Sequence, residues 1–140
     1  MRRFLFALVL AVATLATLGT ATQAQTAHDP AVEATIQHQF DAFLSGDVTT
    51  AFSFASPTIQ GIFGTAENFG LMVQQGYPMV WRPAAVKYLD LRQGPDGLYQ
   101  KVAITDQKGA LHLLEYQMLP AGDGWMIGSV QVLQQPEVGA

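Results

Sequence analysis

The chain has 140 residues, a formal net charge of −4 and no cysteine, and 49% of its residues are hydrophobic. The lack of cysteine excludes disulfides and lipid attachment to a thiol. Apart from the adjacent Arg2 and Arg3, the five remaining lysine and arginine residues form no run or patch, which argues against nucleic acid and anionic membrane surfaces as partners.

Residues 1–24 have the pattern of an export signal. Arg2 and Arg3 give a positive start, an apolar stretch follows, and small residues then lead to an expected cleavage site after Ala24. The apolar stretch is shorter than the roughly 20 residues of a membrane-spanning helix, so an uncleaved anchor is the minor alternative. We therefore expect a periplasmic or secreted protein that is not inserted in a membrane after cleavage. Residues 25–140 would form its single domain, with a net charge of −6 because both signal arginines are lost.

The first half of residues 25–140 predicts a series of helices, because side chains that accept hydrogen bonds precede several helical patterns. The expected starts are Asp29, Asp47, Ser56 and Thr65, and the expected ends include Gly46 and Gly76. Apolar residues recur at helical spacing in the first of these helices, at Val32, Ile36, Phe40, Phe43 and Leu44.

The second half, after Pro83, predicts strands separated by short turns rich in glycine. The strands are expected near residues 85–93, 98–105, 110–119 and 125–134. Short turns between successive strands indicate an antiparallel meander. Helices followed by a meander predict an α+β fold, in which N-terminal helices pack on one face of a curved four-stranded antiparallel sheet.

The stretch GYPMVWRP, residues 76–83, joins the two halves. Its two prolines favour extended backbone, so we expect a stiff crossover. The alternative is that it forms the mouth of a pocket, lined by Tyr77 and Trp81. Arg82 would then anchor a carboxylate ligand, whereas in the simple crossover it would hold local backbone carbonyls or an acidic side chain.

The turns also predict a strand register, with Gln100 opposite Glu115 and Gln117 opposite Ile127. On this register a polar group lies in the middle of the helix-facing side of the sheet, formed by Gln100, Glu115, Gln117, Ser129 and Gln131. Either the register is shifted by one residue, or that end of the sheet is open to water, or the group lines a cavity whose only acid is Glu115. A carboxylate in such a cavity would have a raised pKa and could act as an acid or a base.

The same register places Tyr116, Met118 and Val130 on the outer face of the sheet. A lone sheet covered by helices on one side should present a polar face on the other. An apolar outer surface therefore predicts a homodimer through these three residues.

The order of these elements resembles the nuclear-transport-factor-two-like and SnoaL-like superfamily. Three stretches carry a closer resemblance, to the small bacterial family called domain of unknown function 4864. They are IQHQFDAFLSGDVTTAFSFASPTIQGIFGTAENFGLMV, GYPMVWRP and GWMIGSVQVL, and the resemblance covers nearly all of residues 30–134. It implies helices on a curved sheet around a cone-shaped cavity. Some superfamily members are isomerases, dehydratases or cyclases, and many only bind ligands or dimerise, so the resemblance implies no single activity.

No catalytic constellation stands out in the sequence. His38 falls opposite the apolar side of the first helix and is expected in solvent, and His112 is expected on the outer face of the sheet. No spacing of histidines and acids suggests a metal, and no glycine-rich phosphate loop occurs, so neither metal nor cofactor is expected. The serines lack the surroundings of a hydrolase nucleophile.

Three functional hypotheses follow. The first is a non-catalytic exported domain that binds a small apolar or carboxylate ligand, or a protein partner. The candidate ligand-binding residues are Tyr77, Trp81, Arg82, Gln100, Glu115, Gln117 and Ser129. The second is an isomerase or lyase in which Glu115 is the base and Tyr77, Gln100 or Gln117 orients the substrate. The third is a purely structural dimeric module without a cavity.

Overall fold

The structure is a computed structural model that describes residues 28–134. The expected export signal and its cleavage site lie outside these residues. Within the described part of the chain, no helix is long and apolar enough to cross a membrane.

Five helices form the first half of the described chain: α1 (Pro30–Leu44), α2 (Val48–Ser53), α3 (Pro57–Phe63), α4 (Ala66–Gly76) and α5 (Pro78–Trp81). The four predicted helix starts are confirmed, because each predicted side chain accepts a hydrogen bond from a backbone N–H of the first turn. At α1, for example, Asp29 accepts from the backbone nitrogens of Ala31 and Val32. Local sequence chemistry therefore sets these boundaries.

The short helix α5 corrects the prediction of an extended crossover. Pro78 is the first residue of the helix, a position where its missing N–H costs nothing and its fixed φ fits the helix. The backbone nitrogen of Trp81 donates to the oxygen of Tyr77 at 3.0 Å, and that of Arg82 donates to the oxygen of Pro78 at 3.0 Å. The chain thus makes one helical turn before it enters the sheet.

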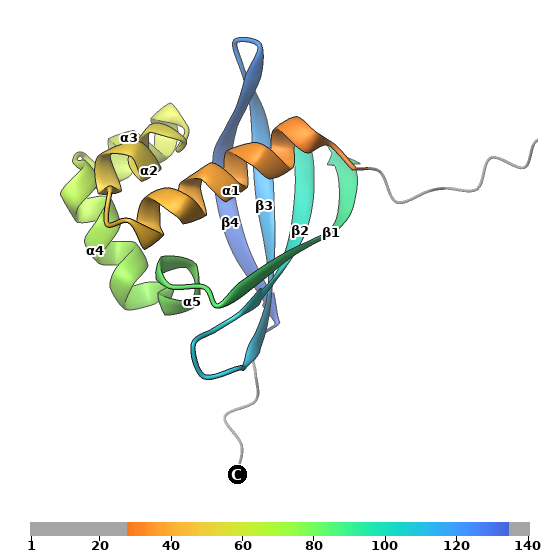
Figure 1. Ribbon diagram of the computed structural model, residues 1–140. Coiled ribbons are helices and arrows are strands. Elements are labelled where there is room, and N and C mark those ends of the chain that lie inside the picture. The colour runs from red at the N-terminus through yellow and green to blue at the C-terminus, as the bar shows by residue number, and fades with distance from the viewer. Residues whose placement is uncertain (1–27, 135–140) are drawn as a thin grey trace, which may run out of the picture.

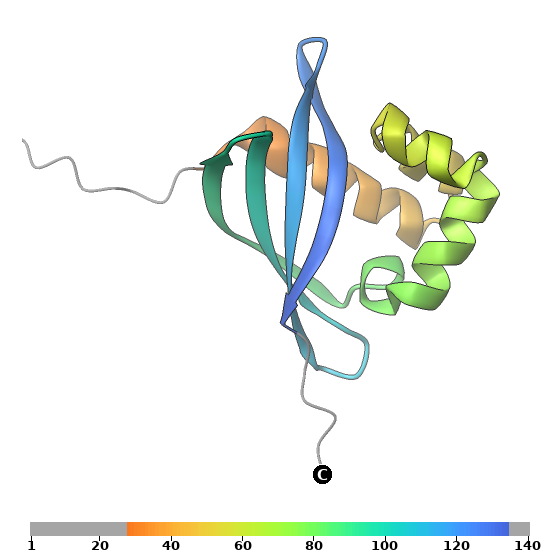
Figure 2. The ribbon, with the colours of Figure 1, turned by 180° about the vertical axis from the view of Figure 1, so that it is seen from behind.

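Four antiparallel strands follow in spatial order: β1 (Ala85–Gly94), β2 (Gly97–Thr105), β3 (Leu111–Ala121) and β4 (Gly124–Gln134). The predicted α+β fold with a four-stranded meander is confirmed. Helix α1 crosses one face of the sheet, and α2, α3 and α4 gather on the β4 side (Figure 1). Seen from behind, the other face of the sheet has no helix over it in the described chain (Figure 2).

The predicted register is correct only near the first turn, where Leu91 lies opposite Gln100. Gln100 pairs with Tyr116 and not with Glu115. The cause is the loop between β2 and β3, in which the carboxylate of Asp106 accepts from the backbone nitrogens of Lys108 and Ala110, both at 2.9 Å. This loop has one more residue than the register assumed, and a one-residue shift moves every side chain of β3 to the opposite face.

The pairing of β3 with β4 also differs from the prediction. Gln117 lies opposite Ser129, whereas Ile127 lies opposite Met118. The register changes between these two pairs, which marks a β-bulge at Gly128. Gln117 and Ser129 therefore share the outer face of the sheet.

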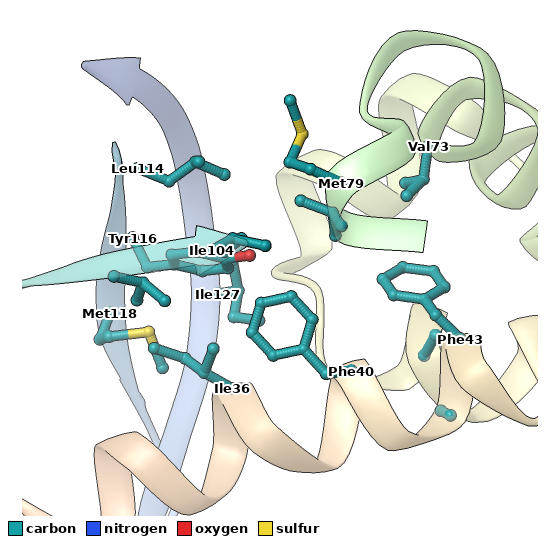
Figure 3. Packing of buried hydrophobic residues seen from close by; sticks show 14 of the residues in the cluster. Ile36, Phe40, Phe43, Val73, Met79, Ile104, Leu114, Tyr116, Met118 and Ile127 are labelled. Atoms are coloured by element: carbon teal, nitrogen blue, oxygen red, sulfur yellow. The ribbon is translucent and has the colours of Figure 1, made fainter. Parts of the chain in front are cut away.

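The core lies between α1 and the sheet. Ile36, Phe40 and Phe43 project from α1 toward side chains of the strands, α4 and α5 (Figure 3). Phe40 meets the ring of Tyr116 edge-on, with 6.1 Å between the ring centroids. Leu44, which was expected on the apolar side of α1, is instead 45% exposed.

The surface predicted to join two copies is not an outer surface. Tyr116 and Met118 are fully buried in the protein's own core, and Val130 packs against that core. The register shift is the reason, because it turns Tyr116 inward and Glu115 outward. Dimerisation itself stays a prediction, now without these residues as its contact.

Strand β4 is an edge of the sheet, and part of this edge is covered by the segment that links α2 to α3. Ala55 forms an isolated parallel bridge with Ile127. The nitrogen of Ser56 donates to the oxygen of Ile127, and the nitrogen of Ile127 donates to the oxygen of Phe54, both at 2.8 Å. The bridge ties the helical half of the chain to its last strand.

Candidate functional site

A cleft of about 320 Å³ opens between the helices and β4, and we call it the apolar cleft. Residues of α1, α3, α4, α5 and β4 line it. Aromatic rings form much of the wall: Phe69 lies 5.9 Å from Phe43 and 5.7 Å from Phe63, measured between ring centroids. Aromatic walls of this kind offer a large area for contact with an apolar ligand.

Helix α4 takes its place beside the apolar cleft because it packs closely against α2. Gly70 of α4 faces Val48 of α2, and a Cβ at position 70 would come within 2.5 Å of a methyl group of Val48. Only glycine permits this close approach. Met72 and Val73, which follow closely after Gly70 in α4, line the cleft.

The polar groups of the apolar cleft are few and uncharged. Gln39 is 5% exposed, and its Nε2 donates to the backbone oxygen of Ala51 at 3.1 Å. Ser129 lies at the β4 side, where its hydroxyl donates to Oε1 of Gln117 at 3.2 Å. Tyr77 completes the polar set. No lysine, arginine, aspartate or glutamate of residues 28–134 lines this cleft.

A second cleft, of about 300 Å³, lies on the other side of α5, and we call it the charged cleft. The loop between β2 and β3 forms its opposite wall. Its lining comprises Pro78, Met79, Trp81 and Arg82 from the α5 segment and Asp106, Gln107, Lys108 and His112 from the β2–β3 hairpin.

Arg82 is held firmly at the edge of the charged cleft. Its Nη1 donates to the backbone oxygen of Phe43 and, at 2.8 Å, to that of Trp81. Its guanidinium lies over the indole ring of Trp81, 4.6 Å from the ring centroid. The backbone oxygen of Arg82 accepts from Nε2 of Gln107 at 3.1 Å. Arg82 thus holds two backbone carbonyls, the local one of Trp81 and the distant one of Phe43.

His112 occupies the back of the charged cleft, which corrects its predicted place on the outer face of the sheet. It is 8% exposed, and its Nε2 lies 2.8 Å from Oδ2 of Asp106. A carboxylate only accepts, so Nε2 carries the proton. The hydrogen bond from His112 and that from the backbone of Ala110 hold the pKa of Asp106 below its ordinary value of 3.8. Asp106 thus closes the loop and fixes the histidine ring at once.

The seven predicted site residues do not form one site. Tyr77 and Ser129 line the apolar cleft, and Trp81 and Arg82 line the charged cleft. Gln100 is fully buried within the sheet, where its Nε2 donates to the backbone oxygens of Leu89 and Lys101 at 3.0 and 2.9 Å.

Glu115 and Gln117 lie on the outer face of the sheet and line neither cleft. Arg92 binds the carboxylate of Glu115 through two nitrogens, with Nη2 to Oε1 at 2.8 Å and Nε to Oε2 at 3.2 Å. The prediction of Glu115 as the acid of a cavity is wrong, because the register shift turns its side chain outward. The same shift places Nε2 of Gln117 near the backbone oxygen of Asp96, at 3.0 Å.

Sequence reasoning missed several residues that shape the clefts. Phe69 and Met72 fit the apolar side of the helix expected after Thr65, and such a pattern does not reveal that part of that side borders a cavity. Lys108 lies in the five-residue loop 106–110, and His112 lies in β3 directly after it; both line the charged cleft. The sequence signal for this loop is the aspartate at its start followed by Gly109. Within residues 28–134, no group of three histidine or acidic side chains could hold a metal.

Comparison with known protein families shows that the model of a family described as domain of unknown function 4864 matches residues 25–140. Neither a curated protein nor a solved structure matches the chain.

Proposed function

The chain belongs to the family described as domain of unknown function 4864, and since that description assigns no activity, we propose a function from the geometry. The protein is a non-catalytic, exported binding domain that holds a small, uncharged, apolar ligand in the apolar cleft. The observation that carries this proposal is a cleft of about 320 Å³ to which residues 28–134 contribute no charged side chain.

Size and chemistry support this assignment. Small-molecule sites commonly measure about 300–1,000 Å³ and combine apolar walls with a few polar groups. The apolar cleft is at the lower end of that range. A ligand that hides about 200 Å² of apolar surface there is stabilised by about 5 kcal/mol at about 25 cal/mol per Å², before the cost of association. A charged group would lose its hydration in this cleft without finding a partner, so a neutral ligand fits best.

Export and the wider fold relationship belong to the same proposal. The positive start and apolar stretch of residues 1–24 support delivery to the periplasm or secretion. The arrangement of helices on one face of a curved meander supports a place in the nuclear-transport-factor-two-like and SnoaL-like superfamily (Figure 1). The isomerase or lyase hypothesis is not continued, because Glu115 is bound to Arg92 outside the cleft.

The first experiment is native mass spectrometry of the protein purified after expression of the full 140-residue chain. A defined additional mass that is lost on denaturation would supply the mass of a bound ligand. The mass of the polypeptide would show at the same time whether the chain has been cleaved after Ala24.

The second experiment titrates the protein with N-phenyl-1-naphthylamine, a neutral apolar fluorophore, excited outside the tryptophan absorption band. Met72→Trp fills part of the cleft and is expected to weaken binding about ten-fold or more, since its side chain lines the cleft. Leu71→Trp is the matched control, because Leu71 precedes it in α4, is 53% exposed and does not line the cleft.

Circular dichroism melting curves would show that both variants fold. Equal weakening by the two variants, or binding that survives Met72→Trp unchanged, would exclude the apolar cleft as the site.

A further inference from the structure

The charged cleft has features of a binding site that the proposed ligand of the apolar cleft does not use. Four of its lining residues can carry charge: Arg82, Lys108, Asp106 and His112. With the histidine counted as neutral, two positive charges and one negative charge leave the cleft with a net charge of +1. An anion is therefore the ligand that its electrostatics favour.

The negative charge of Asp106 is already engaged within the protein. Its Oδ1 accepts from the backbone nitrogens of Lys108 and Ala110, and its Oδ2 contacts Nε2 of His112 at 2.8 Å. An anion in the cleft would consequently meet a carboxylate whose hydrogen-bonding sites are largely occupied by donors. The cationic groups of Arg82 and Lys108, in contrast, keep donors that can still bind a ligand.

Arg82 is fixed in place with donors to spare. Only Nη1 is used by the carbonyls of Phe43 and Trp81, and no acceptor for Nε or Nη2 is found among residues 28–134. The indole of Trp81 supports the guanidinium plane from one side. A planar donor pair that is already oriented loses little freedom when it binds a carboxylate through two hydrogen bonds. Lys108 is exposed on the opposite wall and forms no ion pair within the same residues.

The rest of the wall is apolar. Pro78 is exposed at the rim, Trp81 is half-buried, and Met79 is buried at 4% exposure. Such a wall can cover the hydrocarbon part of a ligand whose charged group reaches Arg82 and Lys108. A phosphate dianion would exceed the net charge of +1, whereas a single carboxylate balances it.

We infer that the charged cleft binds a small organic monocarboxylate, with the carboxylate between Arg82 and Lys108 and the apolar body against Pro78 and Trp81. This site is separate from the apolar cleft and does not depend on the function proposed for it.

The test uses phenylacetate, an aromatic monocarboxylate, with the uncharged phenylacetamide and inorganic phosphate for comparison. Binding is followed by heteronuclear NMR, through the indole N–H of Trp81 and the Nε–H of Arg82. Phenylacetate is expected to bind at least ten-fold more tightly than phenylacetamide, because the amide cannot accept charge-assisted hydrogen bonds on both oxygens. Phosphate is expected to bind more weakly than phenylacetate.

Two substitutions test the cationic side chains. Arg82→Gln should weaken phenylacetate binding about ten-fold or more. Arg92→Gln is its matched control, because Arg92 also lies over an aromatic ring, 4.3 Å from the centroid of Tyr99, but on the outer face of the sheet. Lys108→Glu reverses the net charge of the cleft without touching the core, and should abolish binding even if Arg82→Gln fails to fold. Lys87→Glu, on an exposed position of β1, controls for the overall charge.

Several results would overturn the inference. These are equal affinity for the amide and the carboxylate, tighter binding of phosphate, equal effects of Lys108→Glu and Lys87→Glu, or no saturable shift of the Trp81 and Arg82 signals. If Met72→Trp lost phenylacetate binding while Lys108→Glu still bound phenylacetate, the ligand would lie in the apolar cleft. If Met72→Trp lost only the neutral fluorophore and still bound phenylacetate, the carboxylate site would be independent of the apolar cleft.

Discussion

The apolar cleft and the charged cleft differ in chemistry although they share one helical turn. Tyr77 and Val80 line the apolar cleft, whereas Pro78 and Trp81 line the charged cleft. Each pair is separated by three residues, the spacing at which side chains of a helix lie on the same side. Tyr77 and the four residues of α5 therefore border two different environments within little more than one helical turn, with Met79 also on the side of the charged cleft.

Phe43 lines the apolar cleft and also supports two residues of the charged cleft, Trp81 and Arg82. Its ring lines the apolar cleft and lies 5.7 Å from the ring of Trp81, measured between centroids. Its backbone oxygen accepts from Arg82. Substitution of Phe43 should therefore affect both clefts, whereas changes on one side of α5 should affect one cleft only.

The largest effect is expected for Phe43→Ala. The side chain is fully buried, so its removal should lower the free energy of unfolding by about 3–5 kcal/mol. Because both clefts rest on it, binding of N-phenyl-1-naphthylamine and of phenylacetate should weaken together. Leu44→Ala, at the next and 45% exposed position of α1, should change stability by less than about 0.5 kcal/mol. Urea unfolding measures both, and a variant that loses only one ligand would show that the clefts do not share this wall.

A smaller effect on stability is expected when two tyrosines on the helix-facing side of the sheet are changed to phenylalanine. Neither tyrosine lines a cleft. The hydroxyl of Tyr116 is fully buried and has no hydrogen-bond partner in the described chain, so Tyr116→Phe should raise stability by about 1 kcal/mol. The hydroxyl of Tyr88 donates to Oε1 of Gln37 at 2.9 Å, so Tyr88→Phe should lower stability by about 1 kcal/mol.

Thermal unfolding would resolve this difference, since about 1 kcal/mol corresponds to about 4 °C in Tm for a domain of this size. Neither substitution should change the affinity for either probe. A change in probe affinity in Tyr116→Phe would mean that the sheet behind the clefts takes part in binding.

High salt should weaken ligand binding a few-fold in the charged cleft and leave binding in the apolar cleft nearly unchanged. Phenylacetate binding relies on partly exposed charges, so its Kd should rise about three-fold between about 0.1 and 1 M sodium chloride, as the Debye length falls from about 10 to 3 Å. The Kd of the neutral fluorophore should stay nearly constant, because the described part of the chain places no charged side chain in the lining of its cleft. Fluorescence and NMR titrations in the same buffers measure both. Equal salt dependence for the two probes would contradict the assignment of different chemistry.

The smallest effect is expected on the pH dependence of stability, through Asp106 of the charged cleft. Hydrogen bonds from His112 and the backbone of Ala110 lower the pKa of Asp106 below 3.8 in the folded protein. A carboxylate with a lowered pKa contributes stability above its unfolded pKa, and this contribution is lost as the pH falls through the folded pKa. Asp106→Asn should therefore be less stable than the unmodified protein at neutral pH, with the difference shrinking below about pH 4. Asp123→Asn, in the turn between β3 and β4, is the control. A constant difference from pH 6 to pH 2 would contradict the role given to Asp106.

The helical half was predictable because its signals are local. Asp29, Asp47, Ser56 and Thr65 each bond to a backbone nitrogen within three residues, so the sequence around each of them is sufficient. The turn of α5 was missed because Pro78 was read as favouring extended neighbours, although proline equally suits the first position of a helix.

The sheet shows where such reasoning fails. Its strands were predicted close to their observed ranges, but their faces depended on the length of the Asp106–Ala110 loop. One residue there decides whether Glu115 or Tyr116 points toward the helices. The predicted site came apart for the same reason, because Glu115 and Gln117 were assigned to the wrong face of the sheet. The crossover residues Tyr77 and Trp81, expected at one pocket, line two different clefts.

The bridge between Ala55 and Ile127 has a consequence for how the chain avoids aggregation. Strand β4 runs for eleven residues without a charged side chain, and exposed edge strands of that kind tend to recruit strands from other molecules. The Phe54–Ser56 segment occupies two of its backbone groups with hydrogen bonds. This segment precedes β4 by some seventy positions in the chain, so its cover is synthesised before the strand that needs protection.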